Sequence, residues 1–244
     1  MAELEFTFIG SGNAFAPGGL CWNGFLVDRR YLFEAPPQAL MSLNRIGVGV
    51  NDIEAVLLSH HHGDHFLGLP FLLLQWKYMG RTRPVQIVGP PETEEIARQV
   101  CERTYPTVFD SPVEIEWVVA KPGETLRIGD LSVDPVEVKH DTKLNLNLGY
   151  GCELRGTQFA YSGDSALCDG VLDLARRADV FVSECSSVDE VTDVHMNLRD
   201  DIPRVRAAMA PDAHLVLTHL SDDVREAEGL ANTVIAKDFA SYRF

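Results

Sequence analysis

The feature that most constrains the fold of this chain is a histidine-rich segment directly after a short apolar run. Residues 55–58 read Ala-Val-Leu-Leu, which is typical of a strand buried on both faces of a sheet. Residues 59–65 then read Ser-His-His-His-Gly-Asp-His. The end of a buried strand therefore presents several imidazoles and a carboxylate close together. Neutral nitrogens and a hard oxygen suit zinc, with manganese and iron as alternatives.

Four ligands from this one loop would be strained around a single ion. We therefore expect His60 and His62 to point toward one ion, and Asp64 and His65 toward a second. His61 is expected to lie outside the ligand set. The remaining ligands must come from other parts of the chain.

Three polar residues elsewhere follow predicted strands in the same way. His140 follows a strand over 131–138, Asp164 one over 158–161, and His219 one over 214–218. The carboxyl ends of strands are where loops of a layered α/β protein converge on ligands. We therefore expect these three side chains to meet the histidine-rich segment.

The order of predicted elements indicates an α/β fold in a single domain over residues 1–244. Predicted strands and helices alternate in the first and last thirds, the middle is mainly strands, and no Pro/Gly/Ser linker divides them. The apolar run over 66–76 is interpreted as core, with a homodimer contact as the alternative. The helices are expected over residues 36–46, 69–79, 92–102, 170–177, 198–209 and 223–237.

Charge and composition exclude several classes of protein. With 21 basic and 36 acidic residues, the net charge is −15, which disfavours binding of long nucleic acids. No apolar segment approaches the roughly 18 residues of a membrane helix. The acidic N-terminus and five scattered cysteines, without a Cys-x-x-Cys pair, predict a cytoplasmic protein.

The chain resembles the metallo-β-lactamase superfamily, and within it the ribonuclease Z-like phosphodiesterases. The resemblance implies a four-layer αββα sandwich that binds two divalent metal ions. It is carried by residues 8–12, 59–70, 87–90, His140, 161–165, Glu184 with His195, and 217–221.

The resemblance also implies roles for individual residues. The first ion would be bound by His60, His62 and His140, the second by Asp64, His65 and His219, and Asp164 would bridge them. A hydroxide between the ions would attack the substrate, with Asp64 orienting it. His195, oriented by Glu184, would protonate the leaving group. The chain departs from the family at Met196-Asn197 and Cys185-Ser186, next to this pair.

The predicted substrate is a small or short anionic phosphodiester. The transfer-RNA-processing members of the resembled group carry a basic arm, and the candidate place for it, residues 104–113, is short and lacks lysine and arginine. Two ions would create a positive cavity within an acidic protein. The alternatives are hydrolysis of a thioester or lactone by the same hydroxide, and a metal-binding regulatory protein without turnover.

Overall fold

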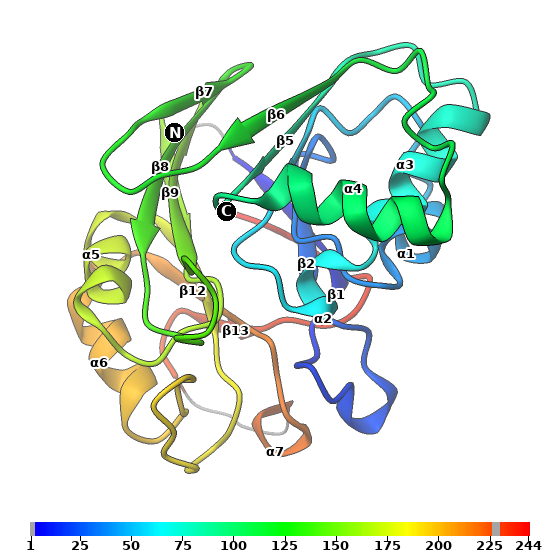
Figure 1. Cartoon of the computed structure of the whole chain (residues 1–244). Helices are drawn as coiled ribbons and strands as arrows, with labels where there is room; N and C mark the ends of the chain where they lie inside the picture. Colours follow the sequence, from blue (N-terminus) through cyan, green and yellow to red (C-terminus); the bar gives the residue numbers. More distant parts are fainter. Residues whose placement is uncertain (1–2, 226–229) are drawn as a thin grey trace.

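Two β-sheets packed face to face form the centre of the computed structural model, which describes residues 3–225 and 230–244 (Figure 1). The first sheet has the strand order β14-β1-β2-β3-β4-β5-β6. Its strands are β1 (Glu5–Gly10), β2 (Gly24–Val27), β3 (Tyr31–Phe33), β4 (Ala55–Leu57), β5 (Val85–Gly89), β6 (Ile115–Val119) and β14 (Ser241–Arg243).

The second sheet has the order β13-β12-β11-β10-β9-β8-β7. β8 and β10 both pair antiparallel with β9, and β10, β11 and β12 pair in parallel. The carboxyl ends of β8, β10, β11 and β12 therefore lie at one edge. The strands are β7 (Leu126–Ile128), β8 (Leu131–Glu137), β9 (Leu148–Leu154), β10 (Thr157–Tyr161), β11 (Val180–Glu184), β12 (His214–Thr218) and β13 (Thr233–Ile235).

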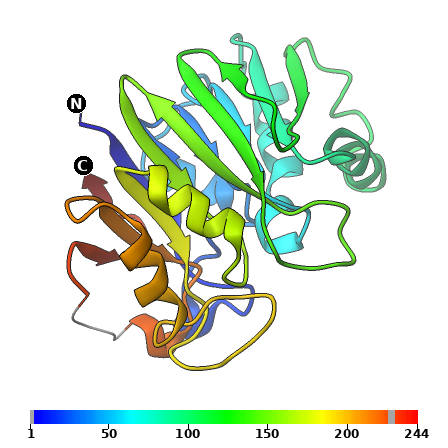
Figure 2. The ribbon, with the colours of Figure 1, turned by 90° about the vertical axis from the view of Figure 1, so that its left-hand side faces the viewer.

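Helices cover the outer face of each sheet. On the first sheet lie α1 (Ala39–Arg45), α3 (Leu69–Tyr78) and α4 (Thr93–Thr104). Figure 2 shows α5 (Asp169–Arg177) and α6 (Asp201–Ala208) over the second sheet. Two short helices, α2 (Gly63–Phe66) and α7 (Asp222–Arg225), and a 3-10 turn, Pro17–Gly19, lie in loops. This arrangement confirms the predicted αββα sandwich.

Aromatic side chains fill the space between the sheets. The rings of Phe25 and Phe33 stack with centroids 4.8 Å apart, and Tyr161 from the other sheet meets Phe25 edge-on at 5.2 Å. In β4, Ala55 and Leu57 face this central layer, while Val56 faces the helices. The prediction of a strand buried on both faces is therefore confirmed, and this strand leads directly into the histidine-rich loop.

The apolar run after the histidines forms α3, as predicted. Leu69, Leu72, Leu73 and Trp76 are buried against the first sheet, which confirms the core interpretation for this face. Phe71 and Tyr78 lie on the outer face and are 40% and 63% exposed. A homodimer contact through that outer face stays a prediction.

The prediction of a helix over residues 223–237 is wrong for much of that range. α7 ends at Arg225, and residues 233–235 form β13, which pairs in parallel with β12. Residues 226–229 lie outside the described part of the chain. Thr233, Val234 and Ile235 are β-branched, so pairing with the edge of an existing sheet is more favourable for them than a helix.

Within the described residues, no helix has the length and apolarity needed to cross a bilayer.

Replacing Trp76 with Ala tests the packing of α3. Trp76 is 2% exposed, so the cavity left behind should lower the free energy of unfolding by about 3–5 kcal/mol. Urea denaturation measures this loss. The matched change Tyr78→Ala, on the exposed face of the same helix, should cost about 0.5 kcal/mol or less. Equal losses for the two variants would contradict this assignment of the helix faces.

Candidate metal centre

All nine residues predicted for the site lie at the edge where the carboxyl ends of the strands meet. His60, His62, Asp64 and His65 follow β4 and enter α2, and Glu184 ends β11. The remaining predicted residues, His140, Asp164, His195 and His219, follow β8, β10, β11 and β12 respectively. The first sheet therefore supplies one half of the site and the second sheet supplies the other.

Backbone geometry limits which residues can lie beside the ligands. Gly163 has φ +60, and a Cβ there would lie 2.4 Å from the carbonyl oxygen of Leu148, so only glycine fits before Asp164. His219 itself has φ 55. Backbone hydrogen bonds from Leu220 N to Ser11 O and from Asn13 N to Leu220 O hold the adjacent segment in place. Strain of this kind at a non-glycine residue is typical of functional sites.

The potential ligand atoms form two groups. One contains His60, His62 and His140, and the atoms that they offer lie within 4.8 Å of one another. The other contains Asp64, His65, Asp164 and His219 at the same spacing. These are the two sets that the resemblance implies. That each set binds an ion stays a prediction.

Asp164 lies between the two groups. Its Oδ2 is 3.2 Å from His65 Nε2 and 3.1 Å from His219 Nε2. The same oxygen is 4.0 Å from His60 Nε2 and 3.9 Å from His140 Nε2. A single buried carboxylate therefore faces both sets of imidazoles.

Several atoms that face this space are buried polar groups without a hydrogen-bond partner among the described residues. They are His60 Nε2, His65 Nε2, His219 Nε2 and Asp64 Oδ2. A buried polar group without a partner is costly, and so many converging on one space call for a ligand that satisfies all of them. Imidazole nitrogens and carboxylate oxygens in these numbers fit divalent cations such as zinc.

The electrostatics of the cavity favour a positive charge. Burial raises the pKa of Asp164, but His219 and His65 facing it prevail and hold the pKa of this carboxyl well below its usual range. Burial lowers the pKa of His65, yet Asp164 and Glu34 hold it well above the usual value. The pKa of His60 is lowered well below the usual value, mainly by burial. Without metal, a proton on His65 therefore supplies positive charge in this cavity. A bound cation would take its place.

Four of the five predicted ligand histidines have a hydrogen-bond partner on the ring nitrogen that faces away from the cavity, and the fifth, His65, has the carboxylate of Glu34 in ion-pair contact with that nitrogen. A metal-binding histidine is commonly oriented in this way, because the partner sets the ring's tautomer. The pairs are His60 Nδ1 with Ser59 Oγ at 2.8 Å, His62 Nε2 with Asp141 Oδ2 at 3.2 Å, His65 Nδ1 with Glu34 Oε1 at 3.4 Å, His140 Nδ1 with Val194 O at 2.9 Å, and His219 Nδ1 with Ser186 Oγ at 2.8 Å.

None of these partners was predicted from the sequence, and three of them contribute side chains from outside the histidine-rich segment. Glu34 directly follows β3 and has φ 66, so it carries the same signal of a polar residue after an apolar strand. Asp141 is the neighbour of a predicted ligand and carries no further signal. Ser186 belongs to a segment noted as a departure from the family, yet its hydroxyl bonds both His219 and Glu184 Oε2. The residue at which the chain differs from the family pattern therefore contacts one predicted ligand and the residue that orients His195.

Glu184 and His195 form the predicted pair. Glu184 is fully buried, and its Oε1 lies 2.8 Å from His195 Nδ1. Burial lowers the pKa of His195, but the charge of Glu184 outweighs burial and raises that pKa to about 9. The His195 ring lies 4.9 Å from that of His140 and 5.3 Å from that of His219. A protonated imidazole at neutral pH therefore borders both groups of ligands.

The second departure also supports this pair. Met196 is buried in the core beneath the second sheet, and its carbonyl accepts a hydrogen bond from Ser186 N. Asn197 pairs with Ser187 as a β-bridge. The segments at Cys185-Ser186 and Met196-Asn197 are therefore joined by backbone contacts. These contacts also fix the neighbouring residues Glu184 and His195 relative to each other.

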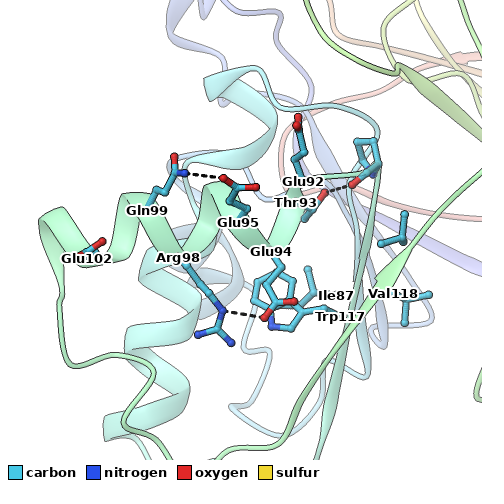
Figure 3. Close-up of a pocket in the computed structure, with 12 residues that line it drawn as sticks. Ile87, Glu92, Thr93, Glu94, Glu95, Arg98, Gln99, Glu102, Trp117 and Val118 are labelled. Carbon is cyan, nitrogen blue, oxygen red and sulfur yellow. Dashed lines mark hydrogen bonds and ion pairs between the residues drawn. The ribbon is translucent and has the colours of Figure 1, made fainter.

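His61 lies outside the ligand groups, as expected. Its Nε2 is 2.8 Å from Thr93 Oγ1, which itself donates to Pro90 O. Thr93 also lines a cavity of about 500 Å³ between α4 and β6, shown in Figure 3 with Trp117 and Arg98 in its wall. None of the nine predicted site residues lines that cavity. The histidine-rich loop is thus attached to α4 by the one histidine of the motif that is not predicted to bind metal.

Comparison with known proteins agrees with this geometry. Residues 29–220 match the family model described as a beta-lactamase superfamily domain. The chain belongs to the metallo-β-lactamase superfamily. It is similar to the ribonuclease Z of Methanosarcina acetivorans, with 25% identity over 96% of each chain. The earlier resemblance is therefore confirmed, and the chain is a metal-dependent hydrolase related to ribonuclease Z.

Solved structures show the same fold. A diphosphatase from the PhnP family superposes with a TM-score of 0.77 and 20% identity, over 99% of this chain and 98% of that one. The short form of human tRNase Z superposes with a TM-score of 0.73 and 20% identity, over 98% of both chains. At this identity the likeness establishes the fold alone.

The pH dependence of metal uptake follows from the charge of the cavity. His65, whose pKa is raised, is protonated in the metal-free protein and must lose that proton before its Nε2 can bind an ion. Metal affinity should therefore fall as the pH is lowered from about 8 to 6. Calorimetric titration of the chelator-treated protein with Zn²⁺, in buffers of different ionisation enthalpy, measures both affinity and proton release. Binding without proton release would contradict the assignment.

Proposed function

We propose that this chain is a phosphodiesterase that binds two divalent metal ions, with zinc as the expected metal. The observation that carries the proposal is the position of Asp164, whose Oδ2 lies within 4.0 Å of imidazoles from both groups. A carboxylate shared in this way is suited to bridge two ions. The first site would consist of His60, His62 and His140, and the second of Asp64, His65 and His219.

When bound, the ions would supply an activated water and offset negative charge that develops on a phosphate. The protein's own contribution begins with Asp64. Burial raises the pKa of Asp64, but the imidazoles of His219 and His65 facing its carboxylate prevail and hold that pKa below the usual range. Asp64 is therefore ionised, and we assign it to orient the attacking water by accepting a hydrogen bond from it.

His195 completes the reaction at the leaving group. Its Nδ1 is engaged by Glu184, so Nε2 is the nitrogen that can donate a proton to a departing oxygen. His195 offers a ring nitrogen within 4.8 Å of the atoms that His140 and Asp164 offer. We assign His195 as the general acid and Glu184 as the residue that orients it and stabilises its protonated form.

A small or short phosphodiester is the proposed substrate class. Ribonuclease Z and the PhnP-family diphosphatase, by their names, act on phosphate-containing substrates, which supports phosphate chemistry here. The net charge of −15 opposes a long polyanion but not a small anion drawn to a positive cavity. The short, lysine- and arginine-free segment over 104–113 supports the same choice.

Asp64→Ala tests the whole site. The change should remove about 10²-fold or more of the turnover of bis(p-nitrophenyl) phosphate, because a ligand and an orienting group are lost together. Asp173→Ala is the matched control: it removes the same side chain from an exposed position on α5 and should leave turnover and metal content nearly unchanged. Metal analysis of the wild-type protein should give two ions per chain. Two ions with turnover only of a thioester or lactone would refute the phosphodiesterase, and two ions without any turnover would indicate a binding protein.

His195→Ala separates substrates by leaving group. An alkoxide needs a proton and p-nitrophenolate does not, so kcat/KM should fall by about 10²-fold or more for alkyl phosphodiesters and by less than about tenfold for nitrophenyl esters. Equal losses for both would eliminate the proton-donor role.

The pH profile of the Glu184→Gln variant should differ from that of the wild-type protein. A general acid must be protonated, so activity falls as the pH rises through its pKa. Loss of the neighbouring charge lowers the pKa of His195, which stands at about 9 beside Glu184. The alkaline decline should therefore begin at lower pH in the variant. An unchanged alkaline limb, measured with an alkyl phosphodiester, would contradict the pairing.

A further inference from the structure

One ligand histidine differs from the other four in its surroundings. The side chain of His62 is 36% exposed, whereas those of His60, His65, His140 and His219 are 4% exposed or less. Packing therefore fixes the rings of the four buried histidines but not that of His62. An exposed imidazole samples several rotamers unless a specific partner selects one.

The partner of His62 is Asp141. Asp141 Oδ2 lies 3.2 Å from His62 Nε2, on the side of the ring away from the cavity. On the other side, His62 Nδ1 lies 3.1 Å from His140 Nε2. When Nε2 donates its hydrogen to the carboxylate, Nδ1 keeps a free lone pair directed into the site. The contact therefore selects both the orientation and the tautomer that metal binding needs.

Asp141 is itself held in place by its loop. The backbone N–H of Lys143 donates to Asp141 Oδ1 at 2.7 Å, and Asn147 Nδ2 donates to the carbonyl of Asp141 at 3.0 Å. Farther along the loop, Asn145 Nδ2 donates to Glu92 beside α4. Because Asp141 also follows His140 directly, one segment carries one ligand of the first site and the orienting group of another.

We propose that Asp141 is a positioning residue that sets the metal affinity of the first site through His62. The inference rests on the proposed pair of metal sites. It concerns the first site alone, because the second-site histidines are oriented by other residues: His65 by the buried Glu34, and His219 by Ser186. Loss of Asp141 should therefore weaken the binding of one ion and leave the other in place.

Zn²⁺ binding by the Asp141→Ala protein tests this selectivity. Titration in competition with a chromophoric chelator should show the dissociation constant of one site raised by about 10- to 100-fold, and that of the other changed by less than about threefold. After dialysis against a weak chelator, the zinc content should fall from two ions per chain in the wild type toward one in the variant. Neither measurement depends on turnover.

Two further variants distinguish positioning from a general effect of charge. Asp141→Asn removes the charge but keeps one acceptor oxygen, which can serve His62 only if the Lys143 N–H gives up its contact, so it should recover part of the first-site affinity that the alanine variant loses. Asp193→Ala removes the same charge from an exposed position two residues before His195, and it should leave both affinities nearly unchanged.

The outcomes separate this inference from the proposed function. If the wild type binds two ions and Asp141→Ala binds both equally well, the positioning role is overturned while the dinuclear site stands. The role is also overturned if Asp141→Asn is as weak as the alanine variant, or if Asp193→Ala weakens binding to the same extent. A wild-type protein that binds no zinc would overturn the dinuclear site itself.

Discussion

The structure depends on a group of ionisable side chains that share one buried space. Imidazoles and carboxylates are rarely left without partners in a protein interior, because removing them from water is costly. Here their unpaired atoms face one another across the edge of two sheets. The raised pKa of His65 and the lowered pKa of Asp164 show that this space already favours positive charge. Metal binding is therefore expected from the electrostatics of the fold itself.

A second layer of contacts makes this arrangement specific. The residues that orient the ligand histidines come from different elements: Ser59 and Glu34 from the first sheet, and Val194 and Ser186 from loops of the second. Ser186 also joins His219 to Glu184, which in turn orients His195. Ligand geometry and the proposed proton donor therefore share one hydrogen-bond network. A substitution in this layer can affect both.

The α/β class and most of the strands could be predicted from the sequence, because apolar strands followed by a metal-binding residue type recur along it, whereas the four-layer arrangement was implied by the resemblance to a known superfamily. β4 with its histidine-rich loop, and the strand ends at His140, Asp164 and His219, are local patterns that survive folding unchanged. β13 and β14 were not predicted, because each is an edge strand that forms by pairing with a single neighbour, β12 or β1, and no local pattern in the sequence identifies that pairing. The roles of Asp141 and Ser186 depend on contacts across the fold, which no spacing in the chain reveals.

The division of the site between the two sheets has a mechanical consequence. A cation held at once by the loop after β4 and by the loops after β8, β10 and β12 would act as a cross-link between segments distant along the chain. Unlike a disulfide, such a link is released on unfolding, so it stabilises the protein by binding the folded state, in which it ties the two halves of the sandwich together. The five cysteines of this protein are unpaired, so bound metal ions would provide the long-range stabilisation that disulfides provide in other proteins.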